Sequence, residues 1–171
     1  MIRELLLAEH SKKQTLYIVK YIGKNKERID ELIKLFLSNE TLIDARAAWV
    51  IHKIEEQHNG ILRPYYSQLI QNLTISTIHD ASKRNILRVL SKIENLNEDD
   101  TGLLIDLSFG FLIDNKEPIA VQVFAMECIY IHGKKYPEIL LELKEIILAK
   151  IEFGSAGFKS RGKRILNGLK R

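Results

Sequence analysis

Four glutamates in the last third of the chain have a spacing that suits binding. Glu138, Glu142, Glu145 and Glu152 are separated by 4, 3 and 7 residues. In an α-helix these intervals place the side chains on one face, so the four carboxylates would form a single row, which we call the acidic stripe. Such a row would attract a basic peptide or protein. The alternative is a solvated helix face without a partner.

Two aspartates in an earlier helical region would extend this negative surface. Asp99 and Asp106 are seven residues apart, which is about two helical turns. The segment from Glu94 to Glu145 contains eleven acids and four bases. A surface of this composition would favour a positively charged partner and repel phosphate groups.

A third set of candidate contact residues lies near the middle of the chain. Tyrosines among polar neighbours suit contact surfaces, because they offer a large area at a small cost in conformational entropy. Two tyrosines are adjacent here, and one of the two must point inward. The candidates in this set are Arg63, Tyr66 and Gln71.

The C-terminal end favours a different ligand. After Gly157 there are six bases and no acid, in a chain whose formal net charge is +4. Lysines and arginines without acids are what phosphate contacts require, so this tail is the alternative site for an anion or a nucleic acid. A terminal repeat also needs a polar outer side, which would explain the same bases without a ligand. The anion-binding candidates are Lys159, Arg161, Lys163 and Arg164.

Several kinds of chemistry lack the residues that they need. The five histidines are scattered without a His-x-x-x-His pair, so we expect no metal site. Glycine-rich phosphate loops and the G-x-S-x-G nucleophile turn are absent from the sequence. Cys128, the only cysteine, is predicted to be a small core residue. We therefore expect no catalytic residue and no cofactor.

The elements that must carry these residues follow from a repeat. The Asp-Ala pairs at residues 44 and 80 are 36 positions apart, and the Lys-Ile-Glu triplets at residues 53 and 92 are 39 apart. A period of this size is typical of stacked helix pairs. We expect helix pairs over roughly 13–23 and 26–37, 44–58 and 62–73, 80–94 and 97–112, and 118–132 and 137–151, with a closing helix over 158–169. Asp44 is the expected N-cap of its helix, and Trp49 is expected in the core.

Residues 44–55, 80–94 and 118–128 resemble the first helices of HEAT repeats, the helix pairs of the ARM-type superhelix. The likeness lies in an acid or a proline at the helix start, a basic position shortly after it in two copies, and small or aliphatic residues beyond. The resemblance covers about residues 13–169. It implies an all-α, right-handed α-α superhelix of about four HEAT-like pairs plus a closing C-terminal helix, in a single domain over residues 1–171.

The resemblance also implies a mode of action. In HEAT-like stacks the second helices line the concave face, which would place the acidic stripe there. We therefore expect a non-enzymatic interaction or scaffold module that binds a protein or peptide segment, with a basic partner favoured. The alternative is a nucleic-acid-binding protein or one of the DNA alkylation repair glycosylase type, and the acidic second helices argue against both.

The sequence also allows a prediction of the cellular compartment in which the protein is found. No run reaches the roughly 20 apolar residues that a membrane span needs, and the first ten residues are too acidic for a secretory signal. We expect a cytoplasmic protein with no membrane partner.

Overall fold

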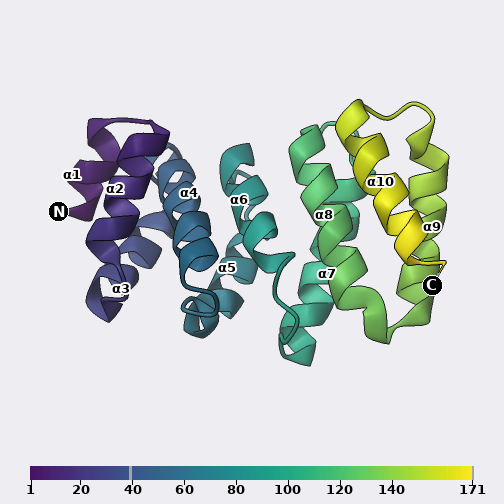
Figure 1. Cartoon of the computed structure of the whole chain (residues 1–171), viewed down its shortest axis with the longest axis horizontal. Coiled ribbons are helices and arrows are strands. Elements are labelled where there is room, and N and C mark those ends of the chain that lie inside the picture. Colours follow the sequence, from purple (N-terminus) through teal and green to yellow (C-terminus); the bar gives the residue numbers. More distant parts are fainter. Residues whose placement is uncertain (39, 171) are drawn as a thin grey trace. The chain divides into compact units, whose positions relative to one another are not determined.

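The computed structural model describes residues 1–38 and 40–170. Within these ranges the chain forms ten α-helices and two short 3₁₀ helices, and no strand (Figure 1). The prediction of an all-α fold is confirmed. The contacts along the chain divide it into two compact units, Met1–Val89 and Leu90–Arg171, and the division falls at the last residue of a helix rather than in a linker. The single domain over residues 1–171 stays a prediction.

The first unit holds the helices expected for the first two pairs and the first helix of the third. Its elements are α1 (Ile2–Ala8), α2 (Lys12–Ile22), α3 (Lys26–Phe36), α4 (Thr41–Gln57), η1 (Arg63–Tyr65), α5 (Tyr66–Asn72) and α6 (Asp80–Leu90). Its core consists of aliphatic side chains at helical spacing together with Phe36 and Tyr66. Among the fully buried members are Leu32, Phe36, Ile51 and Leu69.

The second unit contains four α-helices. They are α7 (Glu98–Ile113), α8 (Ile119–His132), α9 (Pro137–Ile151) and α10 (Ala156–Gly168), and the 3₁₀ helix η2 (Gly133–Lys135) joins α8 to α9. Helix α8 packs against α7, α9 and α10, and α10 also contacts α9 (Figure 1). Cys128 of α8 is fully buried, as predicted for a core residue.

Short polar side chains fix where several helices begin. The side chains of Ser11, Asn25, Asn97 and Ser155 each accept a hydrogen bond from the backbone N–H three residues later, at the starts of α2, α3, α7 and α10. Each of these bonds satisfies a helix donor that would otherwise lack a partner. Beyond α4, Gly60 has a φ of 81°, in the left-handed region that glycine adopts at little cost.

Two local predictions are wrong. Helix α4 begins at Thr41, one turn before Asp44, so Asp44 lies inside the helix, where its side chain is buried. Burial raises the pKa of the Asp44 carboxyl. Trp49 is only partly buried, and its ring meets the edge of the His10 ring at a centroid distance of 5.5 Å. Trp49 therefore lies at the boundary of the core.

Among the described residues, no helix combines the length and the apolar composition that crossing a membrane requires.

Close packing of α10 on α9 depends on a glycine, which gives a prediction about stability. A Cβ atom at Gly162 would lie 2.9 Å from Cγ2 of Ile147, a fully buried side chain. Gly162→Ala should therefore lower the free energy of unfolding by about 1–3 kcal/mol through overpacking. The measurement is chemical denaturation of the wild type and the variant.

The matched control is a glycine on an open helix face. A Cβ atom at Gly102 of α7 would meet nothing within 4 Å. Gly102→Ala should stabilise the fold by about 0.5–1 kcal/mol, because alanine loses less backbone entropy in a helix. Equal effects of the two substitutions would contradict the packing assigned to Gly162.

Candidate functional site

The acidic stripe lies along α9. Glu138, Glu142 and Glu145 belong to this helix and Glu152 follows its last residue; all four are exposed, whereas Leu143 and Ile147 are buried. None of the four glutamates forms a hydrogen bond or an ion pair with another described residue. Their charges are therefore not neutralised by specific partners within this part of the chain.

Apolar side chains accompany the stripe, and sequence reasoning missed them. Leu141 and Leu148 of α9 are 58% and 50% exposed, and each lies four residues before a stripe glutamate. Residues four apart are neighbours on a helix surface, so each leucine borders an acid. Phe153, just beyond α9, is 90% exposed. The outer side of α9 thus combines negative charge with accessible apolar surface.

The two aspartates of α7 are also exposed. Asp99 and Asp106 lie two turns apart, with Gly102 between them on the same side of the helix. The neighbouring Asp100 is different, because it is buried and its carboxylate accepts a hydrogen bond of 2.7 Å from the side chain of Asn97. Asp99 and Asp106 therefore remain available on the surface of α7.

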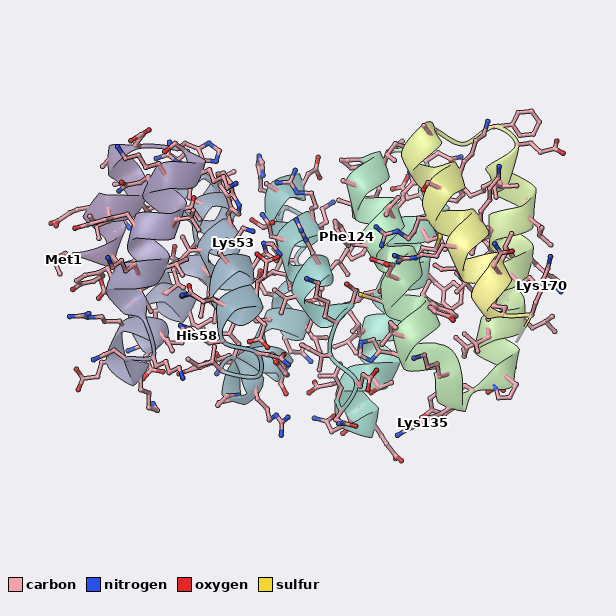
Figure 2. The ribbon with its side chains drawn as sticks, in the orientation of Figure 1. Met1, Lys53, His58, Phe124, Lys135 and Lys170 are labelled. Carbon is pink, nitrogen blue, oxygen red and sulfur yellow. The ribbon has the colours of Figure 1, made fainter. Side chains whose placement is uncertain are left out.

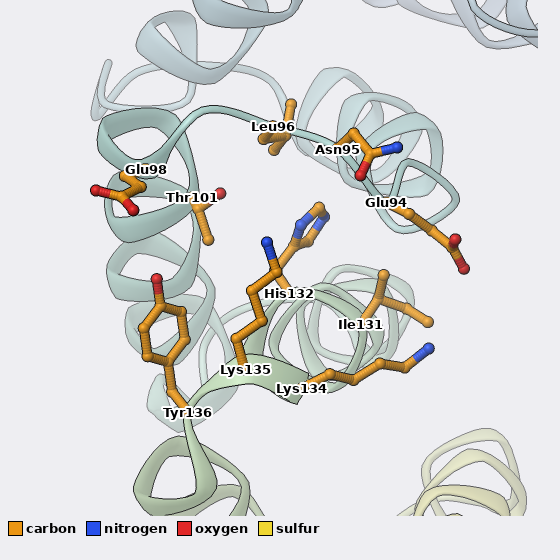
Figure 3. A pocket seen from close by; sticks show the side chains of 10 residues that line it. All are labelled: Glu94, Asn95, Leu96, Glu98, Thr101, Ile131, His132, Lys134, Lys135 and Tyr136. Carbon is orange, nitrogen blue, oxygen red and sulfur yellow. The ribbon is translucent and has the colours of Figure 1, made fainter.

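The starts of α7 and α9 meet at a polar pocket of about 300 Å³ (Figure 3). Glu98 and Thr101 of α7 line one side, and Lys135 and Tyr136, immediately before α9, line another. In Figure 3 the side chains of Lys135 and Tyr136 point into the space between these elements, and Lys135 is also labelled in Figure 2. At this pocket the start of α7, which carries Asp99, lies close to the start of α9, which carries Glu138.

His132 forms the buried wall of this pocket. Its side chain is 6% exposed, and Nε2 lies 2.9 Å from the carbonyl oxygen of Leu90. Burial lowers the pKa of the His132 imidazole, which favours the neutral ring. With Nε2 carrying the proton and donating to Leu90, Nδ1 is left as an acceptor.

This pocket suits hydrogen bonding rather than metal binding. Its titratable lining residues include two acids and two lysines besides His132, so the charges are mixed. Across the described residues, no group of three or more His, Cys, Asp or Glu side chains could hold a metal ion. The arrangement can hold polar groups of a partner at the end of the acidic surface.

The basic tail is partly neutralised by the fold. Arg161 and Arg164 of α10 both pair with the carboxylate of Glu127 on α8. Burial lowers the pKa of the Arg161 guanidinium, which also lies 6.0 Å from the centre of the Phe124 ring. Lys159 is half-buried, whereas Lys163 and Lys170 are exposed, and Lys170 is labelled in Figure 2. Arg171, the last of the six tail bases, lies outside the described residues.

The third predicted set separates into exposed and buried members, all in the first unit. Arg63 and Gln71 are exposed. Tyr66 is only 5% exposed, and its hydroxyl donates a hydrogen bond of 2.7 Å to buried Glu55. Burial, with a smaller contribution from Glu55, raises the pKa of Tyr66. Tyr66 is therefore a core residue, and its assignment as a contact residue is corrected.

Comparison with known proteins agrees with the architecture. A family model described as a HEAT repeat domain matches residues 2–169. The searches among curated proteins and solved structures found no match. The family match confirms the resemblance drawn from residues 44–55, 80–94 and 118–128, and with it the all-α helical-repeat fold.

Tyr66→Phe tests the structural role of the Tyr66 hydroxyl. Glu55 also accepts hydrogen bonds from the backbone N–H groups of Gly60 and Leu62, so it holds the chain after α4 in place. Loss of the hydroxyl should lower the free energy of unfolding by about 1–3 kcal/mol, because a buried carboxylate loses one donor. Denaturation curves measure this effect. Wild-type stability of the variant would contradict the structural role assigned to the Tyr66 hydroxyl.

The lowered pKa of His132 predicts a pH dependence of stability. The unfolded chain takes up a proton at His132 near the ordinary pKa of about 6.5, whereas the folded chain does so only at lower pH. The free energy of unfolding should therefore fall as the pH drops below about 6.5. Denaturation at several pH values measures this loss, which His132→Gln should reduce. His79→Gln, at an exposed histidine, is the control, and equal effects of the two substitutions would contradict the assignment.

Proposed function

Because the chain belongs to the HEAT repeat family, we propose that it is a non-enzymatic interaction module that binds a basic, amphipathic protein segment on the outer sides of α7 and α9. Membership of this family indicates a protein-interaction scaffold in general. The finer proposal concerns the surface and the partner. The binding surface is formed by Asp99, Asp106 and the acidic stripe, together with Leu141 and Leu148.

The observation that carries the proposal is the combination of unpaired acids and exposed leucines on α9. Glu145 and Glu152 border Leu141 and Leu148, and neither acid has an ion pair with another described residue. Complementary charge speeds association and selects the partner, while burial of apolar area supplies much of the affinity. A helix with lysines or arginines beside an apolar row would match both features.

The nucleic-acid alternative has weaker support. A phosphate backbone requires free cations, but Arg161 and Arg164 share Glu127. The acids of α7 and α9 would repel the same backbone. No observation favours glycosylase chemistry over binding.

The cytoplasmic location expected from the sequence stays a prediction.

Neutralising the acidic stripe tests the proposal. The triple variant Glu138→Gln, Glu142→Gln, Glu145→Gln should fold normally, because exposed charges contribute little to stability individually. It should bind a synthetic Lys/Arg-rich amphipathic peptide roughly tenfold or more weakly than the wild type, with a smaller dependence on salt. Calorimetric titration at two salt concentrations measures both effects.

A charge-matched variant supplies the control. Glu4, Glu9 and Glu27 are exposed acids of the first unit, and Gln at all three removes the same charge from a different surface. This variant should bind the peptide nearly as well as the wild type. If instead the two triple variants weaken binding equally, the loss of affinity comes from the change in net charge and not from the acidic stripe. If only substitution of Lys159, Arg161, Lys163 and Arg164 changes ligand binding, the anion site on α10 becomes the better interpretation.

A further inference from the structure

A second pocket is lined only by residues of the first unit. It has a volume of about 420 Å³, within the range of small-molecule sites. Its walls come from the first half of α4, the start of α6 and the connection between α1 and α2. The lining residues that matter here are Leu42, Arg46, Trp49, His79 and Arg84.

One wall of this pocket is apolar and accessible. Leu42 is 54% exposed, and Trp49 is only partly buried although it is the only tryptophan in the chain. The His10 ring meets Trp49 nearly at right angles, with an interplanar angle of 86°, and so supports the indole from one side. A fixed indole at the wall of a pocket suits a flat apolar group.

The charged side chains of the pocket are Arg46 and Arg84, and no acid is among the lining residues. Arg84 is exposed and forms no hydrogen bond or ion pair with another described residue. Arg46 is held in place, because its Nη1 donates a hydrogen bond of 2.6 Å to the carbonyl oxygen of Leu6. His79 accepts the N–H of Ala81 at Nδ1, which leaves Nε2 as the nitrogen that carries a proton.

Two acids that are adjacent in sequence to lining residues do not line the pocket themselves. Asp44, next to lining residue Ala45, is buried within α4 and does not line the pocket, although its carboxyl interacts electrostatically with His79. Asp80, next to His79, pairs with Lys83 at 3.2 Å. The pocket therefore presents two guanidinium groups and a histidine beside an indole, without a carboxylate in its lining.

We propose that this pocket binds a small aromatic phosphate, with the aromatic group against Trp49 and Leu42 and the phosphate held by Arg84 and Arg46. The guanidinium of Arg84, which has no partner among the described residues, matches the geometry of phosphate oxygens through paired N–H donors. Arg46, whose Nη1 already donates to Leu6 and whose Nε is buried, adds the donors of Nη2. The indole wall selects for the aromatic body, so neither half of the ligand should bind well alone.

Trp49 allows a direct test, because all tryptophan fluorescence of the chain reports on this pocket. Phenyl phosphate should change the fluorescence in a saturable manner. Inorganic phosphate and phenol should each bind roughly tenfold or more weakly, since each lacks one half of the interaction. Calorimetric titration with phenyl phosphate provides a second readout. If neither the fluorescence nor the calorimetric titration saturates, the proposal is wrong.

Two variants localise the binding. Arg84→Gln should weaken phenyl phosphate binding roughly tenfold or more, while its thermal melting stays near that of the wild type. Lys20→Gln removes one positive charge from an exposed position on α2 that does not line the pocket, and it should bind like the wild type. Equal weakening by both substitutions, or unchanged binding by Arg84→Gln, would show that the pocket does not hold the phosphate.

Discussion

The burial of α8 is the constraint on which the second unit depends. Eight of the fourteen residues of α8 are buried, and Ile119 is the one exposed residue of this helix. A helix that is apolar on all sides must be covered, and α7, α9 and α10 pack against it. Each covering helix has one face committed to the core, and its opposite face remains for other roles. The position of the acids on α7 and α9 follows from this arrangement.

The charged side chains on the outer faces of α9 and α10 differ in whether they form ion pairs within the fold. On α10, Arg161 and Arg164 turn back to Glu127 of α8, so these bases help to attach the closing helix. On α9, the glutamates make no such contact with described residues, and Leu141 and Leu148 between them stay exposed. Charges used in internal pairs contribute to the fold, whereas unpaired charges beside apolar surface favour an external partner. The acidic stripe is therefore a better candidate for a binding site than the basic tail.

Local sequence features predicted the helices well, because their causes are local. The helical period places most boundaries within a few residues of those in the structure, although the expected N-cap at Asp44 is wrong. The seven-residue helix α1 was missed, since so short a segment shows little periodicity. The burial of Tyr66 depends on Glu55, eleven positions earlier, and the exposure of Leu141 depends on which side of α9 meets α8 and α10. Tertiary packing therefore determines whether Tyr66 and Leu141 are buried or exposed. The spacing of residues in the sequence does not show how the helices pack.

The central claim is that the outer sides of α7 and α9 recognise a basic partner. Mapping amide chemical shifts of the whole chain during titration with the Lys/Arg-rich amphipathic peptide tests it most directly. The largest changes should fall along Glu138 to Glu152 and around Asp99 and Asp106. Changes confined to α10, or to the first unit, would contradict the claim.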